Sequence, residues 1–318
     1  MSERAWTFLR ASWLVVVVVL LSPISPVLLL LIPMALMTLA FRFREAMLAL
    51  VAVLVLLFVF RGGSEASNAG WMATRAWCLL LGGAFVVITM AQRHRSTLTR
   101  AMSASALAGG AVFVTGMVRP GSLAELDWWM GTEIRSAADL AVGMFESVLG
   151  QGGDSGERLS ETFRQVVEFQ QDTYPALLAL ASVAALSLGW FLVHRSRAGS
   201  REMTAVRHFR FSNHLVWVLI AGLALIVFPT GALADRVGQN ATLFMGALYL
   251  LRGMAILIWM AAASVSSAWA ALALSAVAML LYPIVAGTAL VLGLTDTWVD
   301  VRRRLSSARN RDSYDGPE

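Results

Sequence analysis

Hydrophobic residues occur in long unbroken runs along this chain, not in the short alternating patterns of soluble strands and helices. The first run, residues 11–41, has no charged residue, and Pro23 and Pro26 interrupt it. As one straight helix it would extend about 46 Å, whereas the hydrocarbon core of a bilayer is about 30 Å thick. The run therefore predicts a helical hairpin over about 6–21 and 26–41.

Seven further apolar runs follow, and each is long enough, or nearly so, for a membrane segment. They lie at about 46–60, 71–91, 98–118, 175–193, 215–228, 241–263 and 268–294, the last being interrupted at Pro283. A membrane helix needs about 20 apolar residues, and backbone inside lipid must satisfy its own hydrogen bonds. The pattern predicts an all-α, polytopic membrane bundle of about eight or nine segments.

A polar segment, 119–174, has the periodicity of two amphipathic helices instead. Asp154 and Glu157 have capping-box spacing and are expected to start the second helix. We expect an extramembrane helical hairpin, with Trp128 and Trp129 at the membrane interface or against a partner. Three roles remain open for it: packing its apolar face on the membrane helices, covering a ligand site, or binding an extracytoplasmic partner. The expected divisions are N-terminal membrane helices 1–118, the hairpin 119–174, C-terminal membrane helices 175–294, and a basic, polar tail 295–318.

The charges are segregated, and this segregation predicts orientation. The net charge is +5, but residues 118–174 contain four arginines against ten acids. Other arginines cluster at 42–44, 93–100 and 195–210, which the positive-inside rule assigns to the cytoplasm, with the acidic hairpin outside. Nine crossings would place Arg302, Arg303 and Arg304 outside, against this rule, and an extra turn at Pro283 would remove the conflict. The expected location is the inner membrane of a bacterium, so the basic residues indicate no nucleic-acid partner.

The residue inventory excludes several kinds of chemistry. All 25 basic residues are arginine, so the phosphate-binding lysine of a P-loop and any Schiff-base lysine are missing. ATP-driven work would therefore need a partner. The single cysteine, Cys78, and four histidines without metal-binding spacing predict no metal and no cofactor.

Arg252 is the most informative residue because it lies near the middle of the 241–263 run. An arginine at the centre of a membrane span costs about 2.5–3.5 kcal/mol on insertion scales, and such residues are usually paired. The apolar runs contain no Asp or Glu, so the possible partners are helix-end carbonyls, Asp296 or Asp300, an anionic ligand or a lipid headgroup.

Polar and aromatic side chains at the entrances of two runs form a second, weaker group: Asn213, His214, Trp217 and Asn240. Residues at such positions commonly cap helices or anchor them at the interface. If they face one another across the bundle, they line a ligand pocket together with Arg252.

Asp296 and Asp300 are four residues apart and would share one face of a helix. The spacing half-resembles the carboxylate pair of metal-dependent lipid-headgroup transferases, but the upstream Asp-Gly and Ala-Arg pairs of that motif are missing. We therefore expect no enzyme. The simpler interpretation is a helix start with Thr295 as its cap and Asp296 at the positive end of the helix dipole. Arg302–Arg304 then contact phospholipid headgroups or the C-terminal end of that helix.

Three short motifs complete the layout: Arg-His-Phe-Arg-Phe at 207–211, Leu-Arg-Gly-Met-Ala at 251–255, and the ending at 292–304. This layout resembles a family of predicted bacterial multi-pass membrane proteins of unknown function. That family is similar to the S components of energy-coupling-factor vitamin transporters and, more distantly, to the rod-shape-determining protein D. The resemblance implies a helical module that binds a small molecule or a partner and has no ATPase of its own. The first helix lacks the Ala-x-x-x-Ala pair with which S components dock to their coupling subunit.

Two functions follow as hypotheses. The first is a substrate-binding component of a transport system that other subunits energise, with Arg252 at its site. The alternative is a non-transporting scaffold of a cell-envelope assembly, which would use the hairpin or the basic loops. Beyond the lipid bilayer, the expected partners are therefore transporter or cell-envelope membrane proteins.

Overall fold

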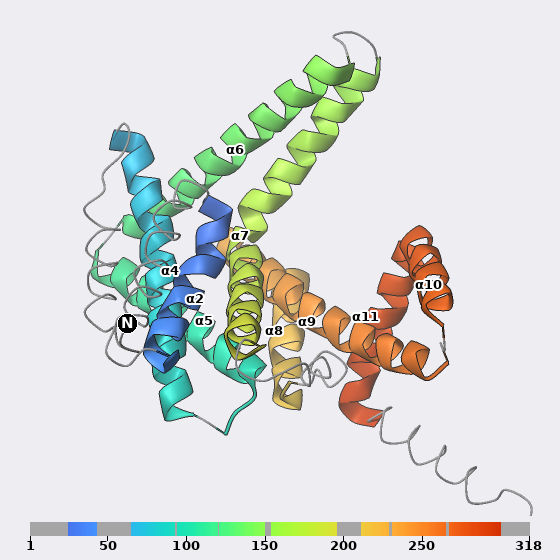
Figure 1. Cartoon of the computed structure of the whole chain (residues 1–318). Coiled ribbons are helices and arrows are strands. Elements are labelled where there is room, and N and C mark those ends of the chain that lie inside the picture. Colours follow the sequence, from blue (N-terminus) through green and yellow to red (C-terminus); the bar gives the residue numbers. More distant parts are fainter. Residues whose placement is uncertain are drawn as a thin grey trace, which may run out of the picture. The chain divides into compact units, whose positions relative to one another are not determined.

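The computed structural model describes residues 25–42, 65–92, 94–119, 121–149, 154–195, 211–228, 231–264 and 267–299. All regular structure in these ranges is helical, and the chain divides into two compact units, 1–199 and 200–318 (Figure 1). Five of the described helices are long and apolar enough to cross a bilayer. The prediction of an all-α membrane bundle is thereby confirmed. The expected segments at 6–21 and 46–60 lie outside the described residues, as do Asp300, Arg302, Arg303 and Arg304.

The first unit contains five described helices, and four of them contain a predicted membrane segment. They are α2 (Ser25–Arg42), α4 (Glu65–Ala91), α5 (Thr97–Val118), α6 (Ser122–Leu149) and α7 (Asp154–Arg195). Helix α2 packs on α4 and α7, and α5 packs on the same two helices. The predicted runs 26–41, 71–91 and 98–118 thus lie within α2, α4 and α5.

The core of this unit lies where α2, α4, α5 and α7 meet. Met37, Leu81, Phe85 and Leu186 are fully enclosed there, and three alanines of α5 let that helix approach closely. The ring of Phe85 meets that of Trp190 edge-on, with 5.8 Å between centroids. These contacts tie the far end of α7 to the N-terminal membrane helices.

The hairpin of α6 and the first part of α7, residues 122–172, matches the predicted pair of amphipathic helices. The two helices pack together, and Gln171 Nε2 donates to the Gly131 carbonyl at 3.2 Å. Helix α7 does begin at Asp154, but it continues through Pro175 to Arg195. The predicted boundary at residue 175 is therefore not a break between helices. With 42 residues, α7 is about 63 Å long, twice the hydrocarbon thickness, so one helix serves both the hairpin and a membrane span.

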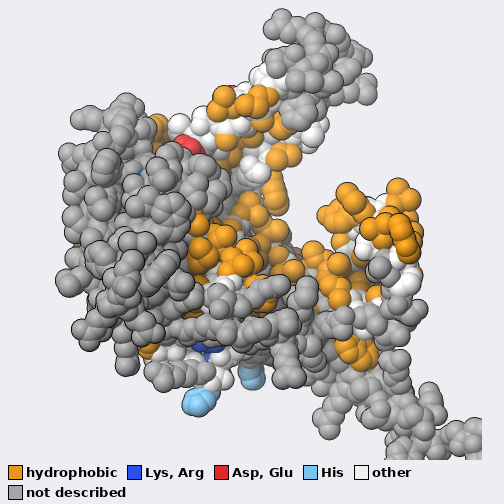
Figure 2. All heavy atoms as spheres, in the orientation of Figure 1, with side chains coloured by type: hydrophobic (Ala, Val, Ile, Leu, Met, Phe, Trp, Pro, Cys, Tyr) orange, Lys and Arg blue, Asp and Glu red, His pale blue; other side chains and the backbone are white. Residues whose placement is uncertain are grey.

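Several large apolar side chains of the hairpin are exposed. Trp128, Leu140 and Met144 are about two-thirds exposed, and Phe169 is half exposed, while Trp129 is partly buried. Hydrophobic side chains cover the visible parts of the hairpin and of α10 in Figure 2. The side chains of Trp128, Leu140 and Met144 therefore do not pack on the membrane helices, which was one of the three roles considered.

The described residues of the second unit form a one-turn 3-10 helix and four α-helices. They are η3 (Asn213–Leu215), α8 (Val216–Val227), α9 (Ala232–Ser264), α10 (Ala268–Leu280) and α11 (Tyr282–Val299). Helix α9 packs on both α8 and α11. The run 268–294 is divided at Leu281, two residues before Pro283, close to the position where an extra turn would remove the charge conflict.

Glycines allow the helices of this unit to touch through their backbones. A Cβ on Gly253 of α9 would meet the Ala289 carbonyl, and one on Gly293 of α11 would meet the Tyr249 carbonyl. Similarly, a Cβ on Gly222 of α8 would lie 3.1 Å from the Gly238 carbonyl of α9. Small residues drive this kind of close approach inside membranes, because lipid offers no hydrophobic driving force between helices.

Candidate functional site

The most distinctive site of the second unit is a buried ion pair between α9 and α11. Arg252 and Asp296 are only 4% and 2% exposed. Arg252 Nε and Nη2 both lie 2.9 Å from Asp296 Oδ2, and Nη2 also donates to the Asp296 carbonyl at 3.1 Å. A charge in a membrane span is tolerated when it is paired and hydrogen-bonded in this way. The structure thus pairs Arg252 with one of the partners that the sequence left open.

The close crossing of α9 and α11 explains why the two charges meet. Tyr249 faces Gly293 and Gly253 faces Ala289, so the two segments run in opposite directions. Helical side chains lean toward the N-terminus of their own helix. On α9 this direction is toward the C-terminal end of α11, where Asp296 lies one turn beyond Gly293.

The segment before α8 completes the coordination of the guanidinium. Asn213 Oδ1 accepts from Arg252 Nη1 at 3.2 Å, and Thr297 Oγ1 accepts a longer bond of 3.5 Å from the same nitrogen. Asn213 Nδ2 in turn donates to the Thr297 carbonyl at 3.0 Å. The Phe211 ring lies 5.4 Å from the guanidinium carbon, in cation–π geometry. Protein groups therefore engage all three guanidinium nitrogens.

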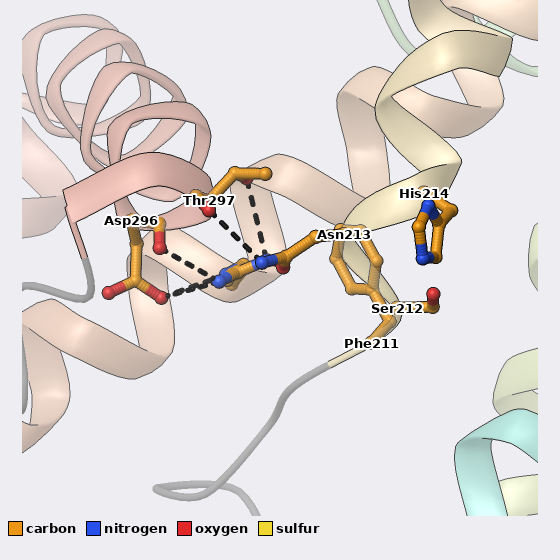
Figure 3. A pocket seen from close by; sticks show the side chains of 7 residues that line it. Phe211, Ser212, Asn213, His214, Asp296 and Thr297 are labelled. Atoms are coloured by element: carbon orange, nitrogen blue, oxygen red, sulfur yellow. Dashed lines mark hydrogen bonds and ion pairs between the residues drawn. The ribbon is translucent and has the colours of Figure 1, made fainter.

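A cavity of about 430 Å³ lies beside this network. Its lining residues are Phe211, Ser212, Asn213, His214, Arg252, Asp296 and Thr297. The dashed lines in Figure 3 connect Asp296, Thr297 and Asn213 within this network, and none of them reaches His214. The lining is mostly polar, although the helices that carry it are strongly apolar.

Of the residues proposed to line a pocket, the structure brings three together and leaves two apart. Arg252, Asn213 and His214 line the cavity. Trp217 is 67% exposed on α8 and is not among the lining residues. Asn240 does not open a helix, because α9 begins eight residues earlier, and its Nδ2 donates to the Arg236 carbonyl at 2.8 Å.

The interpretation of Thr295 and Asp296 as a helix start is wrong. Helix α11 runs uninterrupted from Tyr282 to Val299, and the Thr295 hydroxyl donates back to the carbonyl of Val291 at 2.9 Å. Asp296 is buried against Arg252 and not on a partner or membrane surface. The predicted apolar run stops at residue 294 because Thr295, Asp296 and Thr297 lower the hydropathy, although the helix continues to Val299.

Sequence reasoning assigned no site role to Phe211, Ser212 or Thr297, which also line the cavity. These residues could have been found from their positions in the sequence, because they lie next to or near Asn213 or Asp296 in the chain. In the first unit it also missed Arg75 and Arg100, which are only 3% and 8% exposed. Both lie within five residues of the start of a predicted span, where an arginine is normally attributed to the interface. Among the described residues, no three His, Cys, Asp or Glu side chains are grouped closely enough to hold a metal ion.

The comparisons with known proteins identify a family but no characterised relative. No curated protein and no solved structure matches the chain significantly. A family model described as a predicted membrane protein, DUF2232, matches residues 11–297. Since this match covers most of the chain, the protein belongs to the DUF2232 family and is an integral membrane protein.

Proposed function

We propose that this protein is the substrate-binding membrane component of a transport system, and that the cavity at Arg252 is its binding site. The supporting observation is a polar cavity beside a buried ion pair, in helices that are otherwise apolar. Ionisable residues inside membrane spans characteristically face substrate pathways or the interior of a bundle. A volume of about 430 Å³ also lies within the usual range of about 300–1,000 Å³ for small-molecule sites.

The lining suggests what kind of molecule the cavity binds. Because Asp296 already neutralises Arg252, the site is not a simple anion trap. Ser212, His214 and Thr297 offer hydrogen-bonding groups, and Phe211 offers an apolar ring face. The substrate class is therefore a small polar molecule with a flat or apolar part. With no lysine for a P-loop, the protein works as a non-catalytic component and other subunits supply the energy.

The test is ligand-dependent stabilisation of the purified protein. A panel of small polar metabolites is screened for an increase in the unfolding temperature in detergent. His214→Ala should abolish the increase caused by a hit without unfolding the protein, because His214 lines the cavity but is exposed and outside the ion-pair network. Trp217→Ala, outside the cavity on α8, is the matched control and should leave the response unchanged. A panel that produces no shift, or a shift equal in both variants, contradicts the proposal.

One observation favours a second function, that of a scaffold in a cell-envelope assembly. Large apolar side chains of the hairpin, Trp128, Leu140 and Met144, are exposed, and we infer that they would suit contact with a membrane-protein partner. Replacing Leu140 and Met144 with serine should abolish co-purification of a stoichiometric envelope protein. If the protein purifies alone from the bacterial inner membrane with or without these changes, the scaffold function is excluded.

A further inference from the structure

Arg100 is a buried cation whose charge no carboxylate balances in the described part of the chain. It lies in the first turn of α5 and is only 8% exposed. Its Nη2 donates a long hydrogen bond of 3.4 Å to Thr97 Oγ1. Its Nε is enclosed without a hydrogen-bond partner. Arg252, by contrast, has a carboxylate at 2.9 Å. Arg100 and Arg252 therefore differ in their need for a counter-ion.

Arg100 also lies at the N-terminal end of α5, and a helix N-terminus favours a negative charge as well. Ser96 caps α5 by accepting from the Thr99 N–H at 3.2 Å, but the first N–H groups of a helix have no partners within it. These groups and the helix dipole make the N-terminus of α5 favourable for an anion. The bond from Arg100 to Thr97 directs the guanidinium toward this same end.

Trp190 of α7 holds the guanidinium in place. The guanidinium carbon of Arg100 lies 4.8 Å from the Trp190 ring centroid, and Trp190 is itself packed against Phe85. Stacking on an indole fixes the plane of the guanidinium while leaving its edge available for hydrogen bonds. A fixed, planar fork of donors matches the oxygens of a phosphate group.

From this arrangement we infer that the N-terminal turn of α5, with Arg100, binds the phosphate group of an anionic phospholipid. Helix α5 is long and apolar enough to cross a bilayer from Thr97 to Val118, and such a crossing places its first turn at the depth of the lipid phosphates. The site is in the first unit and is independent of the proposed substrate cavity.

The test compares lipids on the full-length protein. Wild type is purified with equal amounts of phosphatidylglycerol and phosphatidylcholine, and the retained lipids are counted by native mass spectrometry. Wild type should retain phosphatidylglycerol preferentially and unfold at a higher temperature in its presence. Arg100→Gln should weaken this retention by roughly fivefold, the size expected for one basic residue at an anionic surface. Arg95→Gln removes the same charge from the exposed turn before α5 and should have little effect.

Each alternative result overturns the proposal. Equal weakening by both variants would mean that only the overall charge matters. An equal preference of wild type for the two lipids excludes the site even if Arg100→Gln does not fold. If inorganic phosphate stabilises wild type in pure phosphatidylcholine and phosphatidylglycerol adds nothing, the bound group is free phosphate and the lipid assignment is wrong.

Discussion

Removing one partner of the Arg252–Asp296 pair leaves the other charge buried without compensation. Such losses cost about 3–5 kcal/mol, because the remaining ion has lost its partner but not its desolvation penalty. Arg252→Met should therefore lower the unfolding temperature sharply, whatever ligand is present. Fluorescence-monitored thermal unfolding in detergent measures this effect. For the same reason, Arg252 variants are unsuitable for testing ligand binding.

The double variant Arg252→Met with Asp296→Leu is the matched control. Replacing a buried ion pair by apolar residues of similar size is often nearly neutral, so the double variant should regain most of the lost stability. A double variant as unstable as the single one would show that the charges do not act as a pair.

At the residue level, the sequence identified the costly charge but not its environment. Arg252 is recognisable because the positive-inside rule explains arginines in loops but not an arginine far inside an apolar run. Asp296 was among the possible partners, yet neither hydropathy nor spacing indicates that α11 continues through it. Arg100 was treated as one of the loop arginines, because its burial depends on Trp190, ninety residues further along the chain.

Among the elements, the crossing of α9 and α11 should depend on Gly253 and not on helix propensity. A Cβ at Gly253 would meet the backbone of Ala289, which cannot move aside as a flexible side chain would. Gly253→Ala should therefore destabilise the protein by about 1–3 kcal/mol, as overpacking does. The readout is again the unfolding temperature.

Gly246→Ala on the same helix separates packing from propensity. A Cβ there meets nothing within 4 Å, so the alanine should be neutral or stabilise the helix by up to about 1 kcal/mol. If the two alanine variants change the unfolding temperature equally, the backbone contact with α11 does not hold this unit together.

Helix ends were the least predictable feature of the elements, and the misses share a physical cause. Helix α7 passes through Pro175, although proline has no N–H to donate to the carbonyl of Gln171, four residues earlier. Helices in membrane proteins tolerate proline when neighbouring groups satisfy the freed backbone. Helix α9 likewise begins before its apolar run, since Asp235 and Arg236 are compatible with a helix although they lower hydropathy. Hydropathy therefore indicates which residues of a helix suit the lipid, but not the residues at which the helix begins or ends.

For the whole molecule, the second unit settles a conflict within the charge pattern. Asn213 bonds the carbonyl of Thr297, so the start and the end of this unit lie together. Arg210 precedes Asn213 by three residues and Arg302 follows Thr297 by five. Fully extended chains of these lengths reach about 11 and 18 Å, so placing the two arginines on opposite sides of a hydrocarbon layer of about 30 Å would need both chains fully extended in opposite directions. We therefore predict that the chain enters and leaves this unit on the same side of the membrane.

This common side should be the cytoplasm, because the basic loop 195–210 and the C-terminal tail are rich in arginine and together satisfy the positive-inside rule. Four helices, α8 to α11, with the break at Leu281, then return the chain to the side from which it entered. Fluorescent-protein and alkaline-phosphatase fusions in a bacterial host check the assignment. A fusion after Glu318 should fluoresce and lack phosphatase activity, as should one inserted at Ser200, whereas an insertion at Gly152 in the acidic hairpin should show the reverse. Phosphatase activity at the C-terminus together with fluorescence at Ser200 would mean that the Asn213–Thr297 contact does not form in the membrane. The substrate cavity would then lose the wall that this contact supports.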